Sequence, residues 1–185
     1  CCRDNECGPR EACVNGTCVE RPCGQDVPCR VFVTSTTHTG NLGGLTGADA
    51  ICQNLATAAK LPGTYMAWLS TAEVTPSTRF TKSSAPYQLV TGTQIAANWD
   101  ALVDGGIDAP IDRDETGTQV GEPYNVWTKT IADGTFDTDD TTCNDWTVAD
   151  ASASAGGYAD RTNTSWTSGF SGLNCNQEIR LYCFQ

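Results

Sequence analysis

The cysteines divide this chain into two parts. Seven of the eleven lie within the first 29 residues. The other four are widely spaced: Cys52, Cys143, Cys175 and Cys183. Crowded cysteines are typical of a small module held together by disulfides, whereas sparse ones are typical of long-range bridges in a larger domain. We therefore expect a cysteine-rich module or stalk over residues 1–29, a larger domain over residues 30–185, and an oxidising location outside the cytoplasm.

An odd number of cysteines leaves at least one outside intramolecular pairing. Cys1 is the natural candidate, because a chain that begins with cysteine resembles a mature bacterial lipoprotein whose first residue is lipidated. The alternative is that residue 1 is an arbitrary starting point and that the odd thiol is free or intermolecular. A lipid at Cys1 is the only membrane attachment we expect, since no apolar run in the sequence approaches the roughly 18 residues that span a bilayer.

Negative charge is concentrated in the middle of the larger domain. The formal net charge is −11, and from residue 31 onward there are seventeen acidic residues against seven basic ones. Eleven of the seventeen lie in residues 104–145, where Arg113 and Lys129 are the only basic residues. Such a surface repels nucleic acids, heparin-like polymers and anionic lipids. Neutral or cationic ligands fit this charge better.

Hydrophobic periodicity predicts a mixed domain of helices and strands. Apolar residues at offsets of three and four predict a helix that begins at the N-cap Thr46, ends at Leu61 and carries Cys52 on its inner face. A second, weaker helix is predicted over residues 94–103. Strands are predicted over residues 30–35, 65–70, 87–90, 126–128 and 179–184. Residues 104–142 form a long-loop region, and loops of that length are usually functional or stabilised by an ion.

This order of elements resembles the C-type lectin-like fold, which endostatin shares. The resemblance is carried by RVFVTS (30–35), GNLGGL (40–45), GADA (47–50), LPG (61–63), AWLS (67–70), API (109–111), VWT (126–128) and DGT (133–135). These segments are similar to a bacterial family of secreted or lipid-anchored proteins with an endostatin-like domain, and the N-terminal part resembles EGF-like or Dickkopf-like modules.

The resemblance implies an α+β, C-type lectin-like fold with two helices, small antiparallel sheets and a long-loop region. It also implies two disulfides. Cys52–Cys183 would join the first helix to the last strand, and Cys143–Cys175 would tie the loop region.

The sequence departs from the motifs of calcium-dependent lectins. In that fold, calcium-dependent sugar binding uses an acidic-Pro-Asn or Gln-Pro-Asp triplet and a Trp-Asn-Asp triplet. Here EPYN at residues 122–125 contains an extra residue, and NDW at residues 144–146 has the reverse order. Adjacent strand residues point to opposite faces, so a reversed triplet cannot present the same oxygens. We therefore do not expect that sugar site.

Acidic clusters nevertheless make bound calcium an expectation. The candidate ligands share turn-rich surroundings: Asp112, Asp114, Asp133, Asp137, Asp139 and Asp140. Carboxylates that are brought together need a counter-ion, and calcium takes six to eight oxygens. Residues 112–117 resemble the front half of an EF-hand loop, but Pro123 stands where a bidentate Glu is required. The alternative is that these carboxylates only solvate their loops.

Aromatic residues provide candidates for ligand stacking. Most of the five tryptophans lie in apolar patterns that predict the core. Trp166 instead lies among polar residues, so we expect it to face a ligand. Tyr124 and Tyr158 are further candidates.

Catalysis is not expected. The only histidine, His38, has no cysteine or serine motif near it that would indicate a nucleophile and its base. A zinc site would need several His or Cys ligands, and disulfides use the cysteines. Acidic residues are too common here for their spacing to indicate a glycosidase pair.

The sequence therefore predicts a non-enzymatic binding or adhesion module, secreted or lipid-anchored at a bacterial outer surface. We expect it to contact a glycan or surface protein through its acidic loops, with calcium as the one candidate cofactor. The alternative is a structural subunit or tip of a surface fibre that self-associates. Hydrolysis through carboxylates such as Asp112 or Asp137 is a distant third.

Overall fold

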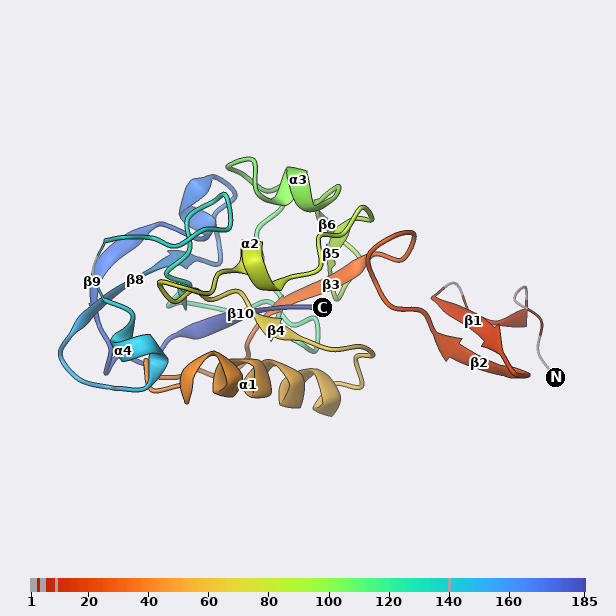
Figure 1. Cartoon of the computed structure of the whole chain (residues 1–185), viewed down its shortest axis with the longest axis horizontal. Coiled ribbons are helices and arrows are strands. Elements are labelled where there is room, and N and C mark those ends of the chain that lie inside the picture. The colour runs from red at the N-terminus through yellow and green to blue at the C-terminus, as the bar shows by residue number, and fades with distance from the viewer. Residues whose placement is uncertain (1–2, 4–5, 9, 140) are drawn as a thin grey trace.

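A computed structural model describes residues 3, 6–8, 10–139 and 141–185. In this part of the chain, a small hairpin extends from one end of a larger α+β body (Figure 1). The hairpin consists of β1 (Glu11–Val14) and β2 (Thr17–Glu20), which pair antiparallel. Asn15 and Gly16 connect them with left-handed backbone angles, as an Asn-Gly turn requires. The disulfide Cys7–Cys18 ties the hairpin to the segment before it.

The body is built on one mixed sheet. Its strand order is β6-β5-β3-β10-β7-β8-β9, and β4 also pairs with β10. The strands are β3 (Cys29–Val33), β4 (Met66–Ala67), β5 (Tyr87–Leu89), β6 (Gln94–Ala96), β7 (Asn125–Trp127), β8 (Ala153–Tyr158), β9 (Phe170–Asn174) and β10 (Arg180–Phe184). The pairs β3–β5 and β10–β7 are parallel, and the others are antiparallel. The expectation of small antiparallel sheets therefore holds only in part.

One long helix, α1 (Gly44–Ala58), packs against β4 and β10 (Figure 1). It buries Ala48, Cys52 and Ala56, so the predicted inner face is confirmed. Its N-cap is Gly43 and not Thr46, because the left-handed φ of 81° at this position suits a glycine. The other described helices are single turns: α2 (Pro76–Arg79), α3 (Trp99–Leu102), α4 (Cys143–Trp146) and the 3₁₀ turn η2 (Thr164–Trp166).

The predicted second helix divides into a strand and a helical turn. Residues 94–96 form β6, and only Trp99–Leu102 is helical. Asn98 separates them with an extended backbone, and its side chain accepts a hydrogen bond from the backbone N–H of Ala101 at 2.9 Å. An asparagine that caps a helix in this way marks its start, so the apolar periodicity over residues 94–103 was misleading.

Two disulfides hold the body together. Cys52–Cys183 joins α1 to β10, and Cys143–Cys175 joins α4 to the residue after β9. Both pairings are those that the resemblance implied. The first spans a sequence separation of 131 residues. On a loop-entropy estimate, a bridge of that span contributes about 5 kcal/mol to stability.

The centre of the core is aromatic. Trp68 is fully buried, and its ring centroid lies 5.1 Å from both Trp166 and Phe184, 5.7 Å from Phe80 and 6.0 Å from Trp99. Its indole N–H donates to the hydroxyl of Thr167 at 2.8 Å. Buried rings in contact at these distances stabilise a core beyond the area they bury.

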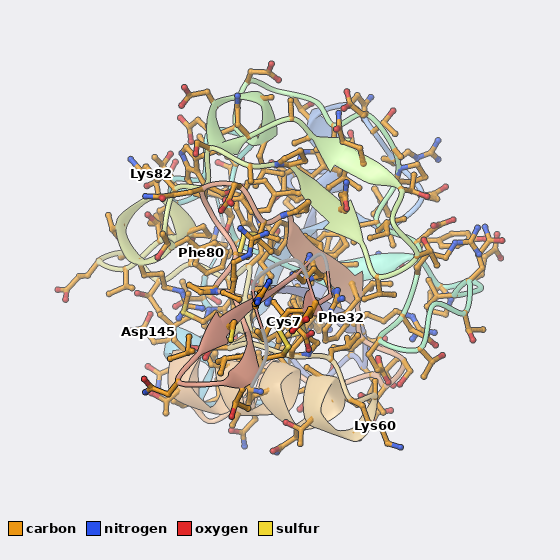
Figure 2. The ribbon with its side chains drawn as sticks, turned by 90° about the vertical axis from the view of Figure 1, so that its right-hand side faces the viewer. Cys7, Phe32, Lys60, Phe80, Lys82 and Asp145 are labelled. Atoms are coloured by element: carbon orange, nitrogen blue, oxygen red, sulfur yellow. A yellow bond between two sulfur atoms is a disulfide. The ribbon has the colours of Figure 1, made fainter. Side chains whose placement is uncertain are left out.

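The segment between the hairpin and β3 packs onto the body. The disulfide Cys23–Cys29 staples it to the first strand of the body. Arg10, directly before β1, adds a second tie between the N-terminal part and the body. Its guanidinium donates to the carbonyl of Pro28 at 2.8 Å and to the side-chain oxygen of Gln185 at 3.2 Å. Figure 2 views the molecule from this end, with the hairpin in front of the body and α1 along its lower edge.

The turn α4 has an unusual handedness. Cys143, Asn144, Asp145 and Trp146 have φ values of 52°, 51°, 53° and 66°, so four consecutive non-glycine residues are left-handed. Each such residue costs about 1–2 kcal/mol. The turn therefore persists only because its surroundings hold it.

Several contacts hold this left-handed turn. The bridge to Cys175 fixes its start, and the indole N–H of Trp146 donates to the carbonyl of Ser70 at 2.8 Å. The carbonyl of Trp146 accepts from the backbone N–H of Leu42 at 2.9 Å. Gly40 allows a close approach, because a Cβ there would lie 2.5 Å from the sulfur of Cys143.

Candidate functional site

A surface pocket lies where β7 begins and β8 ends. We call it the β7–β8 pocket; its volume is about 530 Å³. Its lining residues are Glu122, Pro123, Tyr124, Asn125, Tyr158, Asp160 and Arg161. Asn125 pairs with Tyr158 across the sheet, and the carbonyl of Tyr124 accepts from the backbone N–H of Ala159 at 2.8 Å. Hydrogen-bonded strands thus hold both sides of a pocket whose size is ordinary for a small-molecule site.

Two half-buried tyrosines form the aromatic part of the pocket. The ring of Tyr158 packs against Phe170 with centroids 5.4 Å apart. Gly169 lies against the same ring, and a Cβ there would come within 2.6 Å of a ring carbon. Tyr124 packs against the hydrophobic core at its inner side. Both rings are therefore fixed in place while part of each stays accessible.

The polar groups around these rings include both donors and acceptors. Glu122 and Asp160 offer exposed carboxylates, and Asn125 offers a half-buried amide. The Nε of Arg161 lies 3.5 Å from an oxygen of Asp160, but the arginine side chain is 59% exposed. Ion pairs that exposed are weak, so a ligand can compete for either partner. Rings flanked by such groups suit a polar ligand that has an apolar face.

Asp160 also influences the core beneath the pocket. Burial raises the pKa of Tyr182 well above its usual value, and the negative charge of Asp160 adds to that shift. The Tyr182 hydroxyl therefore stays neutral, and it donates a hydrogen bond to the carbonyl of Trp166 at 3.0 Å.

The expectation that Trp166 faces a ligand is wrong. Its side chain is 0% exposed and packs against Trp68 and Tyr182, with centroids 5.1 and 5.8 Å away. The polar neighbours that suggested a surface position belong to the turn η2, where the side chain of Asn163 accepts from the backbone N–H of Ser165. A single large apolar residue within a polar turn is here the anchor of that turn.

The first predicted calcium cluster forms a self-contained loop. One carboxylate oxygen of Asp114 accepts from the backbone N–H groups of Thr116 and Thr118 at 2.8 and 3.0 Å, and from the hydroxyl of Thr116. Asp112 accepts from the side-chain amide of Gln119 at 2.8 Å. Both carboxylates are nearly buried, at 9% and 8% exposure. Hydrogen bonds to protein donors thus compensate their burial.

The second predicted cluster is spread over several turns. Asp133 accepts from the backbone N–H and the hydroxyl of Thr135. Asp137 accepts from the backbone N–H of Asp139 at 3.0 Å, and one of its oxygens lies 4.0 Å from the ammonium of the fully buried Lys129.

Two predictions fall outside the described residues, namely the calcium ligand Asp140 and lipidation at Cys1. Within the described residues, no group of three or more His, Cys, Asp or Glu side chains could hold a metal ion. Bound calcium therefore stays a prediction.

Sequence reasoning placed two members of the β7–β8 pocket, Tyr124 and Tyr158, among the ligand candidates. It missed Asp160 and Arg161, because an acidic and a basic residue after a Gly/Ala-rich strand carry no distinctive signal. The sequence pattern of the EPYN segment indicated a departure from a lectin motif, and it did not indicate a pocket. Pairing of β7 with β8 brings these distant segments together.

The fold and the pocket define a disulfide-bonded α+β domain with a polar and aromatic surface site. The chain belongs to the family described as "Protein of unknown function (DUF1554)", whose profile matches residues 35–165. The matched region covers more than two thirds of the chain and contains every residue that lines the pocket. No curated protein matches the chain.

The covalent structure indicates where such a chain is stable. Four disulfides join cysteines within the described residues, which indicates an oxidising environment outside the cytoplasm. In the same part of the chain, no helix has the length and apolar character needed to cross a membrane.

Proposed function

We propose that this chain is a non-enzymatic binding module of a bacterial outer surface, and that it contacts a glycan through the β7–β8 pocket. The observation that carries the proposal is the pairing of two fixed, half-buried tyrosines with carboxylate, amide and guanidinium groups in one cavity. A sugar ring matches that arrangement, because its C–H face stacks on an aromatic ring while its hydroxyls exchange hydrogen bonds.

Charge favours a neutral glycan over other polymers. Glu122 and Asp160 flank the pocket, and the chain as a whole carries a formal charge of −11. A polyanion would be repelled before it reached Arg161. A neutral sugar meets no such barrier and can accept from the guanidinium while it donates to the carboxylates.

Two features support a C-type lectin-like architecture. A disulfide joins the first long helix to the last strand, and a second disulfide closes the loop region. The EPYN segment lines the β7–β8 pocket, whereas Asn144 of the NDW segment lines a different pocket. We therefore propose that the side chains hold the sugar directly, without the calcium bridge that lectins build from both motifs.

A glycan array tests this function. Wild-type protein should bind a defined subset of neutral glycans, and Tyr158→Ala should strongly reduce that signal. Glu122→Gln should weaken it, whereas Glu73→Gln should not, because Glu73 is an equally charged, exposed residue outside the pocket. Binding should persist in EDTA. An array on which wild type and Tyr158→Ala give the same pattern would contradict the proposal.

One observation favours the structural alternative, self-association. In the described residues three large apolar side chains are exposed: Val14, Val19 and Val74. Val14 and Val19 lie on the same face of the hairpin, because Ala12 pairs with Val19 and Val14 pairs with Thr17. Sedimentation of wild type and of a Val14→Ser, Val19→Ser variant distinguishes the two functions. A concentration-dependent dimer lost in that variant would favour the structural role.

A further inference from the structure

A second pocket lies beside the left-handed turn, near the opposite end of β8 from the glycan site. We call it the α4 pocket; its volume is about 540 Å³. Its lining residues are Ala72, Phe136, Thr141, Thr142, Asn144, Val148, Asp150 and Ser152. It shares no residue with the β7–β8 pocket.

The left-handed turn α4 places Asn144 in the lining of the α4 pocket. Asn144 and Asp145 are both exposed, and Asp145 lies at the edge of the molecule in Figure 2. The hydroxyl of Thr142 accepts from the backbone N–H of Asp145 at 2.9 Å, which fixes the turn beside the pocket. The amide nitrogen of Asn144 donates to the hydroxyl of Thr147 at 2.9 Å. This leaves the amide oxygen of Asn144 as the available acceptor.

Asp150 is the one charged residue among the described residues of the lining. Its Oδ1 accepts from the backbone N–H of Ser152 at 2.9 Å and from the hydroxyl of the same residue. These hydrogen bonds lower the pKa of Asp150, so the carboxylate stays ionised at neutral and mildly acidic pH. Among the described residues, no side chain or backbone donor bonds to Oδ2.

The hydroxyl groups of the lining are already used as donors. The hydroxyl of Thr141 donates to the carbonyl of Ala153 at 2.7 Å, and that of Thr142 donates to the carboxylate of Asp145 at 2.9 Å. The second oxygen of Asp150 and the amide oxygen of Asn144 therefore remain as acceptors, beside the second N–H of the Asn144 amide. No basic residue is among the described residues that line the pocket.

Apolar surface completes the pocket. Phe136 is half-buried, with the ammonium of Lys129 5.3 Å from its ring centroid, and Val148 contributes a half-buried aliphatic side chain. A metal ion would not use such groups, and the one carboxylate among the described lining residues is too few for calcium. An organic cation uses both the carboxylate and the apolar surface, because its charge pairs with the former while its alkyl part covers the latter.

We propose that the α4 pocket binds an organic cation, the ammonium or guanidinium group of a lysine or arginine side chain carried by a partner protein. Residues 104–145 carry eleven acidic residues and include four residues of the lining, and their negative charge attracts basic segments towards the pocket. The proposal is independent of the glycan site and gives the module a second, protein-directed contact.

NMR titration of isotope-labelled protein tests the proposal with small probes. N-acetyl-arginine amide and N-acetyl-lysine amide should shift the signals of Phe136, Asn144, Val148, Asp150 and Ser152 in a saturable way. N-acetyl-citrulline amide, the neutral isostere of the arginine probe, should leave them unchanged. Asp150→Asn keeps the hydrogen bonds to Ser152 possible, and it should weaken arginine binding about three- to fivefold, as expected for an exposed ion pair.

A matched charge change separates this pocket from general attraction to an acidic protein. Asp100→Asn removes one exposed negative charge in α3, outside the lining, and should leave the dissociation constant within twofold of wild type. Equal effects of Asp100→Asn and Asp150→Asn would overturn the proposal. Equal shifts with the citrulline probe, or unchanged binding by the Asp150→Asn variant, would overturn it as well.

Discussion

The sheet core and the acidic loops are stabilised in different ways. The core buries apolar side chains around Trp68 and is crossed by the bridge Cys52–Cys183. The described acidic loops on either side of β7 bury fewer apolar residues. Carboxylates that accept hydrogen bonds from backbone N–H groups, as Asp114 does, shape these loops. The comparison shows that Asp side chains of the loops stabilise turns through local hydrogen bonds, without any ligand.

Removal of the core bridge should have the largest effect on stability. We expect Cys52→Ala with Cys183→Ala to lower the free energy of unfolding by about 5 kcal/mol, and Cys143→Ala with Cys175→Ala to lower it by about 4 kcal/mol. All four cysteines are fully buried, so the difference reflects sequence separations of 131 and 32 residues. Guanidinium unfolding at one temperature measures both. A larger loss for the loop bridge would contradict the comparison.

Truncation of Trp166 should be nearly as damaging. Trp166→Ala should cost about 3–5 kcal/mol, because the ring packs against Trp68 and Tyr182. Tyr124 is half-buried in the β7–β8 pocket, so Tyr124→Ala should lower the free energy of unfolding by about 1 kcal/mol. Thermal or guanidinium unfolding distinguishes them. If the Trp166→Ala variant remained stable but lost glycan binding, Trp166 would belong to the binding site and not to the core.

Asp114 tests how the loops are held. Asp114→Ala removes three hydrogen bonds to a nearly buried carboxylate, so we expect a loss of about 1–3 kcal/mol. Asp139→Ala, at an exposed carboxylate of the same region, should change the free energy of unfolding by less than about 0.5 kcal/mol. EDTA should lower the free energy of unfolding of the wild type by less than Asp114→Ala does. A larger loss of stability in EDTA would favour calcium as the element that organises these loops.

His38 should give the smallest effect. Burial lowers its pKa below 6.5, and the negative charge of Glu178 opposes that shift. The unfolded chain therefore binds a proton more readily, so this contribution to stability is present above pH 6.5 and is lost as the pH falls through the folded-state pKa. NMR titration of the only imidazole should report a pKa below 6.5. A value above 6.5 would contradict this account.

The two regions also differ in what could be predicted from the sequence. Residues that bury apolar side chains at regular intervals, such as those of α1 and β3, follow from periodicity, and the resemblance supplied both long-range disulfides. The left-handed turn at Cys143–Trp146 could not be predicted, because contacts from residues distant in the sequence hold it against its local preference. Trp166 was misplaced because its polar neighbours describe the turn and not the ring.

The candidate site was predicted only in part for a related reason. Tyr124 and Tyr158 could be named from residue type, whereas the pocket exists only because β7 pairs with β8. The EPYN segment and the residues after Tyr158 are more than thirty positions apart in the sequence. No local pattern links them.

The most direct test of the proposed binding role is the affinity of wild type and Tyr158→Ala for the strongest neutral glycan from the array, measured by isothermal titration. Gly169 and Phe170 fix the Tyr158 ring, so its loss removes a preformed stacking surface. A nucleic-acid base stacked on an aromatic side chain contributes about 1–3 kcal/mol to binding in other proteins. A similar contribution from a sugar stacked on Tyr158 predicts a dissociation constant at least about fivefold higher for the variant. Unchanged affinity in a folded variant would contradict a glycan site in this pocket.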